Sequence, residues 1–254
     1  MGLSSQEAIK IILSFTYEQL HKWIKSRLHG DDGHFPIYEG HETNLSEFLT
    51  ETFKHIKDEE FRDNFIEILN DLTDELTNYS REDVKKEAEY IYELLLLCRS
   101  IRQFKNKDNL YKIAHDGTLK GITAYEIDLH QILLSTLASY RVAGGYQFWI
   151  GQMYDESNIY YANAAFYALL GSNRLDILFK HIGVFIDRFK GELDLELGIQ
   201  ALINDHGRKE IFERFRGIEE SLSTEQKSAV NHVFFELGYD HLYHIPPIEI
   251  GNIG

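Results

Sequence analysis

The chain has 254 residues, of which 43% are apolar and 26% charged, and this ordinary globular composition argues against intrinsic disorder. Its 41 acidic and 26 basic residues give a formal net charge of −15. That charge disfavours non-specific binding to nucleic acid or to an anionic membrane, because both need a basic surface, and it permits a basic protein partner.

The sequence shows no pattern typical of a secretory signal, of a membrane span or of a reactive cysteine. Residues 1–10 lack a basic region followed by an apolar stretch, and no run of the chain approaches the ~18 apolar residues of a membrane span. The only cysteine, Cys98, follows the run Leu94-Leu95-Leu96-Leu97, which predicts a buried and inert thiol. These features predict a cytoplasmic protein.

Proline is absent between Pro36 and Pro246, and apolar residues recur at helical spacing through this long stretch. Because proline is the strongest local helix breaker, its absence allows helices to follow one another almost from end to end. The sequence therefore predicts an all-α fold.

The first predicted helix begins at a cap on Ser4 or Ser5 and ends at Gly30. A polar loop over 30–43 follows, and then a helix over 44–57. Seven potential metal ligands lie in or next to the loop: His29, Asp31, Asp32, His34, Glu39, His41 and Glu42. Their spacing matches neither an EF-hand nor HExxH, so we expect a solvated loop with no metal and no cofactor.

The clearest helical pattern lies at 58–76. Its apolar residues fall on a single face: Phe61, Phe65, Ile68, Leu69, Leu72 and Leu76. The opposite face is almost purely acidic, with Arg62 as the only base. Such a run usually faces solvent, but it could also capture a basic protein surface, for which Glu60, Asp63, Glu67 and Asp71 are the candidate binding residues.

Ser80 is predicted to cap the next helix, which runs to about residue 104 with acidic residues in its first turn. The polar stretch from Lys105 to Gly121 has room for a short helix over 109–115 and is the best candidate hinge. We therefore expect one helical domain over 1–254, with a possible division near 105–122 into helices of 1–104 and of 123–254.

An apolar helix that includes Ile127 should follow and should end before Gly144-Gly145. Aromatic residues are dense around this glycine pair, and Tyr140, Tyr146 and Trp149 could line a binding groove with Arg141 as its lone cation. Tyrosine and tryptophan are common at binding hot spots, but they are as common in the core of helical proteins.

Further helices are predicted over 158–170, 173–189, 194–204 and 209–215, the second of them capped by Asn173. Ser223 and Gln226 form a capping box for a last helix to 237. The whole pattern predicts an array of about ten to twelve antiparallel helices, either an α-solenoid of the HEAT or armadillo kind or an irregular helical bundle.

Motifs of catalysis are absent: the sequence has no GxSxG elbow, no GxxxxGK[ST] phosphate loop and no GxGxxG fingerprint. The leading prediction is a non-catalytic, cytoplasmic protein-binding module of the adaptor or immunity/inhibitor type. It would bind a basic protein through acidic helical faces and aromatic anchors. The alternative is an enzyme of helical fold with a central pocket, which could use a metal held by the 29–42 loop.

Overall fold

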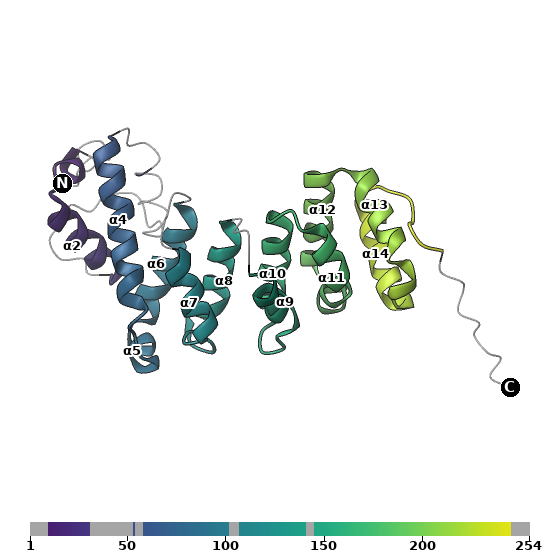
Figure 1. Ribbon diagram of the computed structural model, residues 1–254, viewed down its shortest axis with the longest axis horizontal. Coiled ribbons are helices and arrows are strands. Elements are labelled where there is room, and N and C mark those ends of the chain that lie inside the picture. Colours follow the sequence, from purple (N-terminus) through teal and green to yellow (C-terminus); the bar gives the residue numbers. More distant parts are fainter. Residues whose placement is uncertain (1–9, 31–52, 54–57, 102–106, 141–144, 245–254) are drawn as a thin grey trace. The chain divides into compact units, whose positions relative to one another are not determined.

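A computed structural model describes residues 10–30, 53, 58–101, 107–140 and 145–244 (Figure 1). The elements whose bounds it gives are twelve α-helices, one short 3-10 helix and a single two-stranded hairpin. The predicted all-α helical array is therefore confirmed. The chain forms two compact units, Met1–Tyr140 and Arg141–Gly254, each described here by itself.

The first unit is built around α6 and α8, which pack on one another. Its helices are α2 (Tyr17–Leu28), α4 (Glu59–Leu76), α5 (Arg81–Lys86), α6 (Ala88–Ser100), α7 (Lys107–Asp116) and α8 (Leu129–Ser139). Helices α2, α4 and α5 pack against α6, and α7 packs against α4 and α8. The range 105–122, expected as a hinge, thus includes α7, which packs on other helices of this unit.

Side-chain caps define where several helices of this unit begin. Ser80 forms a capping box with Asp83 at the start of α5, as the sequence predicts. Thr16 forms another with Gln19 at the start of α2, so the long helix expected up to Gly30 is interrupted at residues 14–16. The predicted helix over 44–57 lies outside the described residues, apart from Phe53.

A tight hairpin replaces the expected first turn of the apolar helix. Strands β1 (Thr123–Ala124) and β2 (Ile127–Asp128) pair antiparallel, and the two turn residues, Tyr125 and Glu126, have φ of 50° and 65°. This left-handed pair closes a two-residue hairpin turn. Ile127 is therefore in a strand rather than a helix, and α8 begins only after Asp128, whose carboxylate accepts from the N–H groups of His130 and Gln131 at 2.8 and 3.2 Å.

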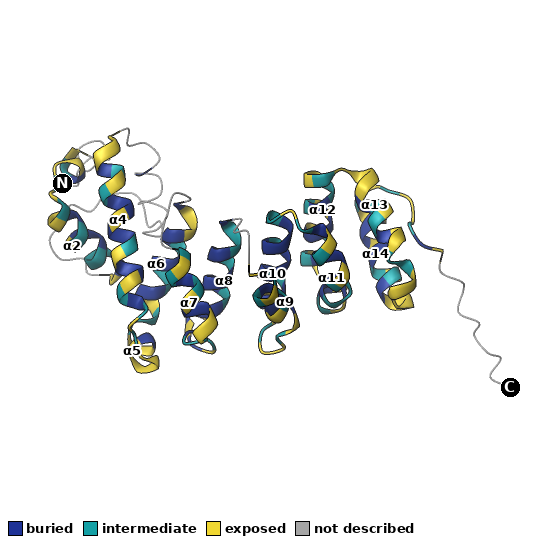
Figure 2. Ribbon diagram, viewed as in Figure 1, coloured by how far each residue is buried: buried dark blue, intermediate teal, exposed yellow. Residues whose placement is uncertain are grey.

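The second unit is a succession of short helices that pack mainly on near neighbours in sequence. They are α9 (Tyr146–Tyr154), α10 (Ile159–Gly171), α11 (Leu175–Phe189), α12 (Leu193–His206), α13 (Arg208–Gly217), the 3-10 helix η1 (Glu219–Ser221) and α14 (Thr224–Glu236). Helix α11 contacts α9, α10, α12 and α14, while α12 also contacts α10 and α13. Figure 2 shows that most of these helices combine buried and exposed faces.

Aromatic rings fill the middle of this second core. Phe166 of α10 and Phe185 of α11 stack with ring centroids 4.1 Å apart, and Gly198 of α12 lies directly against both rings. The predicted capping box of Ser223 and Gln226 opens α14. Asn173 does not cap α11 as expected; it has φ of 59° between two helices, and α11 begins at Leu175.

None of the described helices combines enough length with enough apolar character to cross a bilayer.

Candidate protein-binding surfaces

Four carboxylates cover the exposed side of the first half of α4. Glu59, Glu60, Asp63 and Glu67 are all exposed, and their spacing of three and four residues places them on one face. None of the four has an ion-pair partner among the described residues. We call these four residues the α4 acidic surface.

The carboxylates of the second half of α4 are used in contacts within the unit. The hydroxyl of Tyr17 donates to Asp71 at 2.5 Å, and Lys25 lies 2.5 Å from Glu75. The amide of Asn109 donates to Asp74 at 2.9 Å, which joins α7 to α4. Asp71 is therefore a packing residue as well as an exposed one, unlike Glu60, Asp63 and Glu67.

Basic residues are few around the α4 acidic surface in the part of α4 that the structure describes. The one base of the helix's first half, Arg62, has its guanidinium 4.6 Å from the ring centroid of Phe53. Burial raises the pKa of the nearby Tyr17 hydroxyl, and the charges of Asp71 and Glu67 raise it further. The helix also has no basic residue in its last turn.

The aromatic residues proposed as anchors lie mostly inside the two units. In the first unit Tyr140 is buried and its hydroxyl donates to the carbonyl of Cys98; in the second, Trp149 is only 2% exposed. Both are core side chains, so the structure corrects their assignment as surface anchors. Tyr146 is half-buried beneath the guanidinium of Arg174, and Arg141 lies outside the described residues.

Other aromatic residues of the same segment are the ones that reach the surface. Tyr154, at the end of α9, and Tyr160, in the first turn of α10, are each about half exposed. The Tyr154 hydroxyl lies 3.1 Å from Nδ1 of His181 on α11, which fixes the orientation of its ring. Sequence spacing could not separate these tyrosines from the buried ones, because the apolar pattern of α9 and α10 extends over most of each helix.

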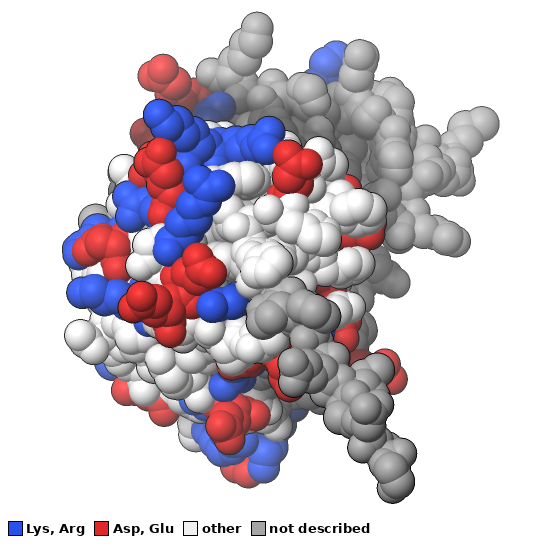
Figure 3. Space-filling model, turned by 90° about the vertical axis from the view of Figure 1, so that its right-hand side faces the viewer, with Lys and Arg blue, Asp and Glu red and all other residues white. Residues whose placement is uncertain are grey.

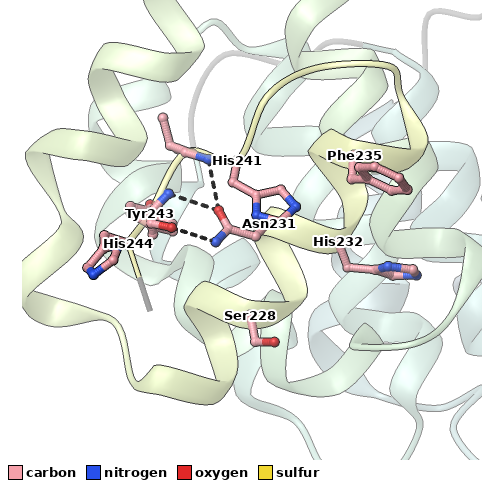
Figure 4. Close-up of a pocket in the computed structure, with 8 residues that line it drawn as sticks. Ser228, Asn231, His232, Phe235, His241, Tyr243 and His244 are labelled. Carbon is pink, nitrogen blue, oxygen red and sulfur yellow. Dashed lines mark hydrogen bonds between the residues drawn. The ribbon is translucent and has the colours of Figure 1, made fainter. Parts of the chain in front are cut away.

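A pocket of about 890 Å³ lies where the chain after α14 folds back on that helix (Figure 4). Its lining comprises Ser228, Asn231, His232, Phe235, His241, Leu242, Tyr243 and His244. The buried side chain of Asn231 bonds to the backbone of Leu242 and Tyr243 at 2.8 to 2.9 Å. The hydroxyl of Tyr243 donates to the carbonyl of Phe215, so this wall of the pocket is firmly held.

The surface at the end of the second unit has mixed charge, in contrast to α4. Figure 3 shows lysine and arginine alternating there with acidic residues around an uncharged area. Arg214 pairs with Glu210 at 2.8 Å, and Arg208 lies over the rings of Phe212 and Tyr239. Basic and acidic residues are mixed in this region, so it presents no surface of a single sign.

The metal site considered for the 29–42 loop lies almost wholly outside the described residues. His29 is described, and its Nδ1 lies 2.7 Å from the carbonyl oxygen of Lys25, while Nε2 lies 3.1 Å from Glu87. Its ring stacks on Tyr90. In the described part of the chain, no three metal-ligating side chains converge. The metal-dependent enzyme stays a prediction.

In comparisons with known proteins, no protein-family model, no curated protein and no solved structure matches the chain. The functional argument therefore rests on the surfaces described above. Of the surfaces described so far, the α4 acidic surface combines exposed side chains with a single sign of charge.

Proposed function

We propose that this chain is a non-catalytic protein-binding module of the cytoplasm, which captures a basic protein surface through the α4 acidic surface. The supporting observation is that Glu60, Asp63 and Glu67 are exposed and have no cationic partner in the described residues, whereas the carboxylates one and two turns later are engaged by α2 and α7. An adaptor or an inhibitor of a basic protein would both use such a surface.

Helix stability alone does not account for this arrangement. Glu59 and Glu60 in the first turn are favourable to the helix dipole, but Glu67 lies two turns further on. The like charges at Glu59 and Asp63, and at Asp63 and Glu67, each disfavour the helix by about 0.2–0.5 kcal/mol. A basic partner would relieve this repulsion, and the surface would speed its approach through long-range attraction.

The proposal is tested by charge reversal on α4. We expect Glu60→Lys/Asp63→Lys/Glu67→Lys to lose a basic partner that the original protein retains when it is purified from its native cells at low salt. The original complex should dissociate at an ionic strength of about 1 M, where the Debye length falls to about 3 Å. Affinity purification with identification of stoichiometric companions measures both effects.

A matched control separates this surface from net charge. Asp205→Lys/Glu213→Lys/Glu236→Lys changes the net charge by the same amount at three exposed positions of the second unit. This control should keep the partner, and circular dichroism should show equal helicity in both variants. Retention of the partner by the α4 variant, or its loss from both variants alike, would refute the assignment to α4.

A further inference from the structure

Two leucines at the start of α12 are exposed on the same side of the helix. Leu193 is 64% and Leu197 45% exposed, and a separation of four residues places them one above the other. On the neighbouring α10, Tyr160 is 46% exposed. Single exposed apolar residues are normal, but a group on adjacent helices is typical of an interaction surface.

A hydrogen bond joins the two helices next to these side chains. The amide of Asn163 on α10 donates to the carboxylate of Asp194 on α12 at 2.7 Å. Tyr160 lies one turn before Asn163 on the same face of α10, and Leu193 directly precedes Asp194. We call Tyr160, Leu193 and Leu197 the α10–α12 surface.

The charge around this surface is negative. Glu192, Asp194 and Glu196 alternate with the two leucines along the first turns of α12. The nearest basic residue in sequence, Lys190, forms an ion pair with Glu225 of α14, with the two charged groups 2.8 Å apart. Carboxylates at a helix N-terminus favour the dipole, but that effect explains the acidic residues and not the exposed leucines.

We infer that the α10–α12 surface docks a basic amphipathic helix of a partner protein. Apolar residues of that helix at i, i+3 or i+4 would cover Leu193, Leu197 and Tyr160, and its flanking lysines or arginines would face Glu192, Asp194 and Glu196. This site lies in the second unit and shares no residue with the α4 acidic surface. The inference can therefore be tested independently of the proposed function.

A labelled synthetic peptide tests the site on the whole chain. The peptide has about 18 residues, or five helical turns, with leucine along one face and lysine on both flanks. Fluorescence anisotropy should show binding that Leu193→Gln/Leu197→Gln weakens by at least about tenfold. A control substitution of another exposed aromatic residue, Phe235→Gln, should leave the affinity unchanged.

Two further measurements locate the contact and define its chemistry. The peptide should slow amide hydrogen exchange at the beginning of α10 and of α12 in the original protein. A peptide with glutamate in place of lysine, and a scrambled peptide of the same composition, should both bind at least about tenfold more weakly. The α4 triple reversal should keep the leucine-dependent part of the affinity.

Several results would overturn the inference. Equal binding by the double-leucine variant, equal binding of the glutamate or scrambled peptide, or protection confined to other helices would each do so. A dimer of the original chain that the leucine substitutions dissociate would show that a second copy covers this surface instead. Both leucines are exposed, so unchanged helicity of the variant should accompany any of these outcomes.

Discussion

Some individual side chains in this protein join helices through charged and aromatic contacts. Arg174, just before α11, makes a two-pronged contact with Asp176, with both nitrogen–oxygen distances 2.9 Å, and its guanidinium also lies over the ring of Tyr146 on α9. The arginine lowers the pKa of Asp176 to about 2. The Asp176 carboxylate therefore helps to hold the Arg174 guanidinium over the Tyr146 ring.

This contact should be lost only in strong acid. An ordinary aspartate has a pKa near 3.9, so a lowered pKa means that the contact is fully present above about pH 4 and disappears as the pH falls through about 2. NMR titration of the Asp176 carboxyl should therefore find it still mostly ionised at about pH 3. In Arg174→Gln the midpoint should rise toward the ordinary value, and an unchanged midpoint would show that the arginine is not the cause.

Helices in the second unit approach one another closely where a glycine permits it. An ideal Cβ on Gly198 would lie 3.0 and 3.1 Å from atoms of the Phe185 ring and 3.2 Å from the Phe166 ring. Both phenylalanines are fully buried, so neither ring has free space to move into. Gly151 in α9 is a contrasting case, because a Cβ there would meet nothing within 4 Å.

The two glycines give a matched pair of substitutions. We expect Gly198→Ala to destabilise the protein by about 1–3 kcal/mol through overpacking, more than alanine's helix preference of about 1 kcal/mol can offset. Gly151→Ala should instead stabilise it by about 0.5–1 kcal/mol. Urea denaturation followed by circular dichroism measures both, and stabilisation by Gly198→Ala would disprove the close packing.

Element positions were largely predictable from sequence, because caps and apolar spacing act locally. Ser80 and Ser223 begin helices as expected, and the exposed carboxylates of α4 oppose its buried face. The break before α2 was missed, although Thr16 and Gln19 carry a capping-box signal inside the apolar stripe. The hairpin before α8 was missed because its turn has neither glycine nor asparagine.

Surface assignments were harder, because they depend on which helices cover each residue. Tyr140 and Tyr160 look alike in sequence, yet one is buried and the other is about half exposed. Leu193 and Leu197 are likewise exposed, while Leu195 and Ile199 of the same helix are buried. Only tertiary packing distinguishes these cases.

At the scale of the whole molecule, the chain forms two compact units. The boundary lies between Tyr140 and Arg141. Leucines of α6 and α8 dominate the first core, and the rings around Phe166 and Phe185 dominate the second. Because each unit encloses its own apolar residues, each has the means to unfold as its own cooperative system.

Calorimetry should therefore resolve two transitions. Gly198→Ala, in the second unit, should lower the midpoint of only one of them and leave the other in place, because Gly198 packs against Phe166 and Phe185 of its own unit. A single transition that shifts as a whole would show instead that the two units unfold together.

The turn between β1 and β2 has a consequence for how this sequence can diverge. Tyr125 and Glu126 hold left-handed backbone angles that asparagine and glycine adopt far more readily. The Tyr125 ring meets Tyr92 of α6 edge to face. Burial raises the pKa of the Tyr125 hydroxyl, and Glu89 and Glu93 of the same helix raise it further. Substitution of the pair by Asn-Gly would relieve the strain of this turn. In homologous sequences, we therefore expect a tyrosine at position 125 to be inherited together with Tyr92 and Glu89, and a glycine-containing turn to accompany their loss.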